Sequence, residues 1–162
     1  MSAAQPLRHS NRLAWQARAH KVWAAGTEAP HGVRTLGQLT LVPAMRAGEM
    51  RNLWVIEADG HAHFLTHGKS CGCSYVVGQP SNMVLVVVDF IDAVRWHEDL
   101  GIACVVAFNV ENMLHVIRRV WLDHDAKIIV ATNSYDSRIQ DAARAVRAAY
   151  LRSDLTEWGK CS

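Results

Sequence analysis

Residues 83–109 read MVLVVVDFIDAVRWHEDLGIACVVAFN. Four of the five residues at 84–88 are valines, and all five are apolar. Such a run is typical of a strand in a parallel sheet, because helices cover both faces of that sheet. We expect a helix over 89–100 that stops at Gly101, followed by a second buried strand over 102–108. This order predicts the βαβ unit of an α/β fold.

The alternation of strand and helix continues toward residue 150. Apolar side chains recur every three or four residues over 110–121, which predicts an amphipathic helix. A third strand is predicted at Lys127–Ala131, and Asp136 or Ser137 is expected to cap a last helix. The inner face of that helix is expected to hold Ile139, Ala142, Ala143, Val146 and Tyr150. Residues 81–162 therefore predict a Rossmann-type parallel sheet flanked by helices, with right-handed crossovers.

The first half of the chain, residues 1–80, has a different pattern. A helix is predicted from about residue 11 to 25, with Gly26 ending it. Two short alternating stretches around an Asp-Gly turn at 59–60 predict a β-hairpin or meander. Pro43 is expected at a strand end or edge, because proline cannot donate to a ladder. We expect a small β-rich α+β subdomain before the α/β core.

Composition excludes several classes of protein. The 162 residues are 50% apolar and 20% charged, which argues against disorder. Seventeen basic and fifteen acidic residues give a charge of +2, too small for a strong overall field. No apolar run approaches the ~20 residues that cross a bilayer, and no secretory signal is evident. The four cysteines form no disulfide framework, so we expect reduced thiols and a cytoplasmic protein.

Polar residues follow each predicted strand of the core. Asp89 follows the first strand, Asn109 the second, and Asn133 and Asp136 the third. The carboxyl ends of parallel strands are where α/β sheets bind ligands. Carboxylates there could share a Mg²⁺ ion, with Asp89 and Asp136 as the candidates. The alternative is that these residues cap the helices that follow them.

Two weaker motifs lie in the first half. His61, His63, Cys71 and Cys73 could begin a zinc site, although the spacing differs from that of structural zinc sites. A solvated hairpin that carries histidines is the alternative. Lys69, in Gly-Lys-Ser, resembles the end of a phosphate-binding loop, but the preceding glycine of that motif is absent. Lys69 could still contact a phosphate as a single positive charge.

The order of motifs between about residue 20 and residue 149 matches a known pattern. The motifs are Ala29-Pro-His-Gly-Val-Arg34, Thr40-Leu-Val-Pro43, Asn52-Leu53, His63-Phe-Leu65, Gly72-Cys73, Val77-Gly78, Val86-Val-Val-Asp-Phe-Ile-Asp-Ala93, His97-Glu98, Gly101, Val105-Val-Ala-Phe-Asn109, Asn112, Leu114 and Ile128-Ile-Val-Ala131. Together they resemble the Toprim region of DNA primases from plasmids, phages and integrative elements. The resemblance implies a Toprim-like core over residues 81–162.

The residues that the resemblance assigns to chemistry differ from those of the family. The family holds Mg²⁺ with a glutamate after the first strand and an Asp-x-Asp after the third. Here Asp89 stands at the glutamate, and Asn133 and Tyr135 stand at the two aspartates. Loss of two charges predicts weak Mg²⁺ binding at most, and no other cofactor is expected. The chain is also expected to lack the family's further strand. The resemblance thus implies a degenerate Toprim domain whose vestigial acid set is Asp89, Asp92, Asn133 and Asp136.

Three functions follow from this interpretation. The first is a non-catalytic module of a mobile genetic element that binds DNA or a replication or transfer protein, and not a membrane. Its cleft is expected to contain Asp89, Asn109, Asn112, Asn133 and Lys69. The second is a free-standing inhibitor or regulator of plasmid replication or conjugation that acts by protein contact. The third is a residual Mg²⁺-dependent nucleotidyl transferase or nuclease that uses Asp89, Asp92 and Asp136.

Tryptophan exposure discriminates between the first two functions. The regulator would be favoured if tryptophan rings face solvent, and the three candidates are Trp96, Trp121 and Trp158. For Trp121, which belongs to the apolar pattern of the predicted helix at 110–121, we expect packing in the core.

Overall fold

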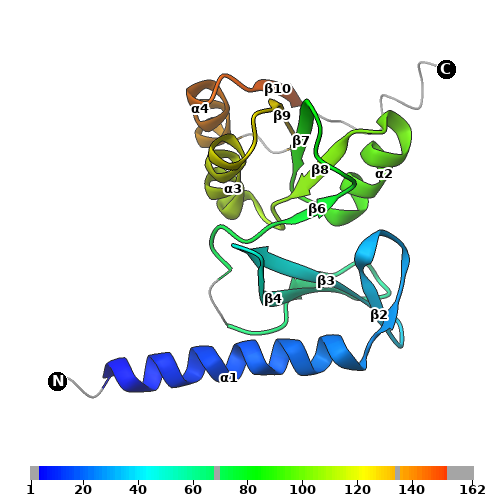
Figure 1. Ribbon diagram of the computed structural model, residues 1–162, viewed down its shortest axis with the longest axis vertical. Helices are drawn as coiled ribbons and strands as arrows, with labels where there is room; N and C mark the ends of the chain where they lie inside the picture. Colours follow the sequence, from blue (N-terminus) through cyan, green and yellow to red (C-terminus); the bar gives the residue numbers. More distant parts are fainter. Residues whose placement is uncertain (1–3, 68–69, 134–135, 153–162) are drawn as a thin grey trace. The chain divides into compact units, whose positions relative to one another are not determined.

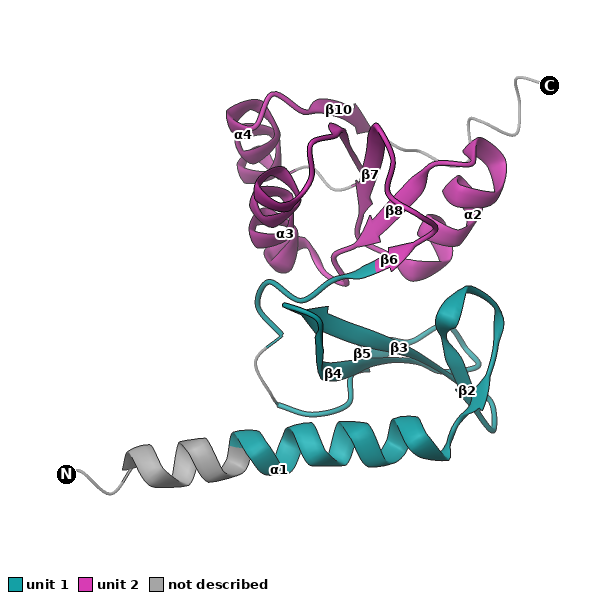
Figure 2. Cartoon of the chain, viewed as in Figure 1, with its two compact units in different colours: residues 1–75 teal, residues 76–162 magenta. Residues whose placement is uncertain are grey.

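The computed structural model describes residues 4–67, 70–133 and 136–152 (Figure 1). The chain divides into two compact units, residues 1–75 and residues 76–162 (Figure 2). Each unit has a five-stranded sheet. No helix in the described ranges is both long enough and apolar enough to cross a membrane.

The first unit is an antiparallel sheet with one helix. Its strands pair in chain order: β1 (Thr27–Glu28), β2 (Arg34–Leu36), β3 (Leu39–Arg46), β4 (Glu49–Ile56) and β5 (Ala62–Phe64), with a short 3-10 turn, η1 (Pro30–Gly32), after β1. Helix α1 (Ala4–Ala25) packs on β4 and buries Ala19 in a core with Leu41 and Leu53. It begins at Ala4 rather than at residue 11, since a proline such as Pro6 is tolerated in a first turn.

The predicted hairpin is confirmed, but the prediction for Pro43 holds only in part. Strands β4 and β5 pair from Ile56 and Ala62 outward, and Gly60 turns the chain with a φ of +90°. Pro43 lies inside β3, opposite Leu53 of β4, rather than at a strand end. The pairing of β3 with β2 stops at Leu41, so Pro43 lies where the second edge of β3 has no ladder partner.

The second unit contains a partly parallel sheet, in which the three predicted core strands are parallel. Its spatial order is β10–β9–β7–β8–β6, with β7 parallel to β8 and β9, and β9 parallel to β10. The strands are β6 (Tyr75–Val77), β7 (Met83–Val87), β8 (Ala103–Val106), β9 (Lys127–Thr132) and β10 (Ala149–Arg152). The predicted α/β class is therefore confirmed for this unit.

Helices cover both faces of this second sheet. They are α2 (Phe90–Leu100), α3 (Val110–Asp123) and α4 (Ser137–Ala145). In Figure 1, α3 and α4 lie on one side of the strands and α2 lies on the other. The chain passes from β7 to β8 on one side of β7, and then returns to β9 on the opposite side. The order of strands thus reverses between β7 and β9, which is the switch point where such sheets bind ligands.

The prediction that the chain lacks a further strand is wrong. Strand β10 pairs with β9 along Ala149–Arg152, so Tyr150 belongs to a strand and not to the last helix. Helix α4 ends at Ala145 because Arg147 adopts a left-handed φ of +57°. The N–H of Ala148 then donates to the carbonyl of Ala143 at 2.9 Å, which closes a Schellman-type cap. The cap redirects the chain into β10.

The core of the second unit comes from the predicted strands and helices. Buried side chains of β7, β8, β9, α3 and α4 form one cluster. Its members include Val84, Val86, Val105, Met113, Val116, Ile117, Ile128, Val130 and Ile139. Because both faces of β7 and β8 are covered, their apolar runs show no alternation. The same burial fixes the carboxyl ends of β7 and β9 beside each other.

Candidate functional site

A small cavity lies at the switch point between β7 and β9. Its volume is about 20 Å³, which is room for about one water molecule. The lining residues are Val87, Val88, Asp92, Trp96, Ala131, Thr132 and Asn133. Asn133, predicted from a strand end, and Asp92, a member of the vestigial set that the resemblance implies, are thus brought to one cavity.

Asp92 is the carboxylate of this cavity, and its surroundings disfavour its charge. The side chain is half-buried in the first turn of α2. Burial raises the pKa of Asp92, the negative charge of Asp89 raises it further, and Arg95 opposes the shift. The cavity therefore holds one acid that prefers to be protonated more than an exposed aspartate does.

The other polar residues at the strand ends cap helices. An oxygen of Asp89 accepts from the N–H of Ile91 at 3.4 Å, at the start of α2. The side chain of Asn109 accepts from the N–H of Asn112 at 2.8 Å, at the start of α3. Asp136 caps α4 in the same manner. The capping interpretation is therefore confirmed at all three helices, and each strand end is fixed to the helix after it.

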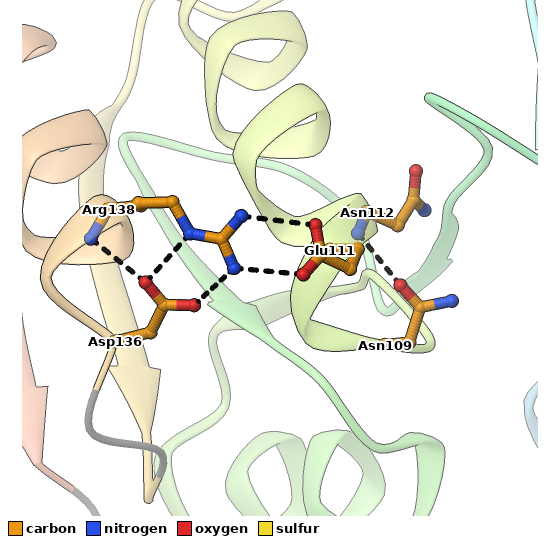
Figure 3. Close-up of polar contacts among 5 residues, drawn as sticks. All are labelled: Asn109, Glu111, Asn112, Asp136 and Arg138. Atoms are coloured by element: carbon orange, nitrogen blue, oxygen red, sulfur yellow. Dashed lines mark hydrogen bonds and ion pairs between the residues drawn. The ribbon is translucent and has the colours of Figure 1, made fainter.

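Asp136 is also held by a side chain, as Figure 3 shows. Oδ1 of Asp136 accepts from the backbone N–H and Nε of Arg138, and Oδ2 accepts from Nη2 at 2.8 Å. Arg138 also donates to Glu111 of α3, from Nη2 to Oε1 at 2.8 Å and from Nη1 to Oε2 at 3.3 Å. The hydrogen bonds from Arg138 lower the pKa of Asp136. Both oxygens of this carboxylate thus face a fixed positive charge.

Asn112 has a structural role at the end of β8. Its side chain is buried, and Nδ2 donates to the carbonyl of Ala107 at 2.8 Å. Phe108, the residue after Ala107, has a left-handed φ of +72° and donates its N–H to the carbonyl of Val88 at 2.9 Å. A bulky residue rarely adopts this φ. Asn112 therefore supports a strained turn, and this bond directs its amide to the backbone rather than to a cleft.

The two candidate Mg²⁺ ligands, Asp89 and Asp136, both have hydrogen-bond partners within the protein. Asp89 is exposed and accepts the N–H of Ile91, and Asp136 is occupied by Arg138. Asn133 adds no charge, whereas Mg²⁺ prefers carboxylates in near-octahedral geometry. Over residues 4–67, 70–133 and 136–152, no three His, Cys, Asp or Glu side chains form a group that could hold a metal ion.

The candidate zinc ligands lie in different environments. The rings of His61 and His63 are 5.9 Å apart, and Nε2 of His63 lies 3.3 Å from Oε1 of Glu57. Cys71 is exposed, whereas Cys73 is buried, and burial raises the pKa of the Cys73 thiol. Three residues singled out in the sequence, Lys69, Tyr135 and Trp158, lie outside the described residues.

The expectation for Trp121 is wrong, because its side chain is 53% exposed. It lies about 80° around α3 from the fully buried Met113, at the flank of the apolar stripe. There it lines a groove of about 320 Å³ between α3 and α4. The lining residues are Leu114, Ile117, Arg118, Trp121, Ala142, Ala145 and Val146. By contrast, Trp96 is buried. The spacing of the apolar residues predicted the helix that contains Trp121, but it did not predict that the Trp121 side chain is exposed.

No family model, curated protein or solved structure matches the chain.

Proposed function

We propose that the chain is a non-catalytic, Toprim-like module of a mobile genetic element that acts by binding DNA or a replication or transfer protein. The order of its motifs is similar to that of plasmid and phage primases. The strand order supports this proposal, because it brings Asp92 and Asn133 to the switch point between β7 and β9.

The contact between Asp136 and Arg138 carries the non-catalytic part of the proposal. A Mg²⁺-dependent catalytic site for phosphate chemistry needs carboxylates free to hold the ion. Asp136 is the acid nearest in sequence to the third-strand positions, and it pairs with Arg138 through both oxygens. A divalent cation at Asp136 would have to displace the guanidinium and would be repelled by it. The remaining candidate ligands for a divalent cation are two carboxylates, Asp89 and Asp92, and one neutral amide, Asn133.

Calorimetric titration with Mg²⁺ and Mn²⁺ tests this part. We expect no binding tighter than millimolar, in the wild-type chain and in Asp89→Ala alike. Asp125→Ala, which removes an exposed carboxylate beyond α3, serves as the charge-matched control. Micromolar binding that Asp89→Ala abolishes and Asp125→Ala retains would overturn the proposal and favour a metal-dependent enzyme.

A free-standing regulator that acts by protein contact is the second candidate. The exposed ring of Trp121 favours it, because tryptophan is enriched among the residues that dominate protein interfaces. Mobility shifts with single- and double-stranded DNA discriminate the two partners. Retardation that weakens steeply as salt is raised supports DNA binding, and none at low salt supports a protein partner.

A further inference from the structure

The groove between α3 and α4 has an apolar floor and an exposed aromatic wall. Its floor includes Ile117, which is fully buried, and Ala142 and Val146, which are half-buried. Trp121 forms part of its lining, and the neighbouring Leu122 is 60% exposed. Leu122 lies about 100° further around α3 and does not line the groove, so Trp121 is the large exposed apolar side chain of its lining.

The charges around the groove do not cancel. Each acidic residue of α3 and α4 is in an ion pair: Glu111 with Arg138 at 2.8 Å, Asp123 with Arg119 at 3.3 Å, and Asp141 with Arg144 at 3.4 Å. Arg118 lines the groove and Arg147 follows α4 one residue after Val146, and both are exposed. Neither makes an ion pair with any residue in the described ranges. Arg118 therefore brings to the lining of the groove a positive charge that is not paired within the described ranges, and Arg147 adds a second one next in the chain to Val146.

We infer that this groove docks an acidic amphipathic helix of a protein partner. Large apolar side chains at i, i+3 or i+4 and i+7 on that helix enter between Trp121 and Val146, as amphipathic helices do in other grooves. Asp and Glu beside them face Arg118 and Arg147, whose charges have no ion-pair partner among residues 4–67, 70–133 and 136–152. The inference rests on the second candidate function, because it names the surface and the partner chemistry of a protein contact.

Binding of a designed peptide to the full chain tests the inference. The probe is a fluorescein-labelled 18-residue helix with leucines at those spacings and glutamates elsewhere. A second peptide has lysines in place of the glutamates. We expect amide chemical shifts of the chain to change along α3 and α4 with the acidic peptide. By fluorescence anisotropy, the acidic peptide is expected to bind at least tenfold more tightly than the basic one.

Matched variants assign the binding to the groove. Trp121→Ala and Arg118→Glu are each expected to raise the Kd of the acidic peptide at least tenfold. Leu100→Ala removes a similarly exposed apolar side chain from α2, and Arg18→Glu reverses an exposed charge on α1. Both controls are expected to leave the Kd within twofold. Arg147→Gly is expected to weaken binding while raising Tm, because glycine relieves the left-handed φ of +57°. Weaker binding by a more stable chain excludes unfolding as its cause.

Several results would overturn the inference. Equal affinity for the acidic and basic peptides, or chemical shift changes away from α3 and α4, would exclude an acidic helix in this groove. A dimer that Trp121→Ala dissociates in sedimentation would identify a second copy as the occupant. Tenfold tighter peptide binding by Trp158→Ala would identify the chain's own residues 153–162, which include Asp154, Leu155 and Glu157. The DNA mobility shift tests the second candidate function, on which the inference rests, without the peptide, and the metal titration tests the non-catalytic part of the first, so each can fail alone.

Discussion

Arg138 and Glu111 join α4 to α3 through two hydrogen bonds between residues 27 positions apart, at 2.8 and 3.3 Å. The same guanidinium holds Asp136, so one cation pairs with the acid after β9 and with an acid on the neighbouring helix. Such a shared cation gives each carboxylate a fixed counter-charge without a metal ion. The following predictions test this contact and three others.

The first prediction concerns the acid that Arg138 holds. Replacing Arg138 with Met should raise the pKa of Asp136, because the side-chain hydrogen bonds that lower it are lost. The backbone N–H at position 138 still donates to Oδ1 of Asp136, so part of the lowering should persist. Carboxyl-carbon NMR titration measures the change. Arg144→Met, which removes the partner of Asp141, should leave the pKa of Asp136 unaltered. The same pKa in Arg138→Met as in the wild type would contradict the assignment.

The second prediction concerns pH and the switch-point cavity. Because burial raises the pKa of Asp92, its ionisation opposes folding once the pH exceeds the ordinary aspartate value of about 3.9. Asp92→Asn should therefore raise Tm by an amount that grows as the pH rises from about 4. The gain should become constant above the folded-state pKa. Below about pH 4 the carboxyl is protonated in both states, so the gain should vanish.

Thermal unfolding from pH 4 to 7 measures this dependence. Asp125→Asn, the exposed control beyond α3, should show no comparable gain over the same range. A Tm difference between Asp92→Asn and the wild type that is independent of pH would show that packing, and not charge, distinguishes the two side chains.

The third prediction concerns the contact of Gly78 with His97. A Cβ at Gly78 would lie 2.7 Å from Nδ1 of His97, which donates to the carbonyl of Ile102 at 2.8 Å. Gly78 also has a φ of +87°, so alanine there combines overlap with a strained backbone. Gly78→Ala should lower the free energy of unfolding by about 2–4 kcal/mol.

Gly101→Ala is the matched control for this substitution. Gly101 has a φ of +70° but no neighbouring atom within 4 Å of a Cβ. Its cost should be that of the left-handed backbone alone, about 1–2 kcal/mol. Denaturant unfolding measures both variants. Equal losses would mean that the His97 ring moves aside without cost.

The fourth prediction concerns Asn52 in the core of the first unit. Its Nδ2 donates to the carbonyl of Thr66 at 3.0 Å, and its Oδ1 accepts from the N–H and hydroxyl of Thr66 and from the N–H of Leu53. The side chain is fully buried. Asn52→Ala should cost about 2–4 kcal/mol, because buried backbone groups lose their partners.

Thr66→Val removes a single hydroxyl donor from the same network. It should cost about 1 kcal/mol, which is the usual net value of one hydrogen bond. Denaturant unfolding again measures the free energies. A loss in Asn52→Ala no larger than that in Thr66→Val would show that water replaces the amide.

Local patterns predicted the elements whose causes are local. The valine-rich run at 84–88 predicted β7, and helix capping was the alternative to a ligand site for Asp89, Asn109 and Asp136. Capping depends on a residue and the few residues after it, so the sequence contains that information. The bounds of α1 and the existence of β10 were not predicted correctly. Strand β10 has only four residues, and its partner β9 is separated from it by a helix.

The candidate site was predictable only in part, for the same reason. Asn133 was expected at a strand end and Asp92 only from the resemblance, and the strand order β9–β7–β8 brings them to one cavity. The pairing of Asp136 with Arg138 was not expected, although the two residues are only two positions apart in the chain. Either the arginine or a metal ion can satisfy that carboxylate, and the position of Glu111 favours the arginine. The hypothesis of a Mg²⁺ site at Asp136 assumed that a metal ion, and not an arginine, is the partner of this carboxylate.

By itself, the amino-acid sequence determined an α/β core of buried strands, its helix caps and an antiparallel hairpin, because periodicity and capping act over a few residues. The tertiary structure alone decided that Trp121 is exposed beside a positively charged groove and that Arg138 spans α3 and α4. Exposure and long-range ion pairs depend on which helices become neighbours on the sheet. The order of the strands in the sheet determines which helices are neighbours, and no local pattern in the sequence encodes that order.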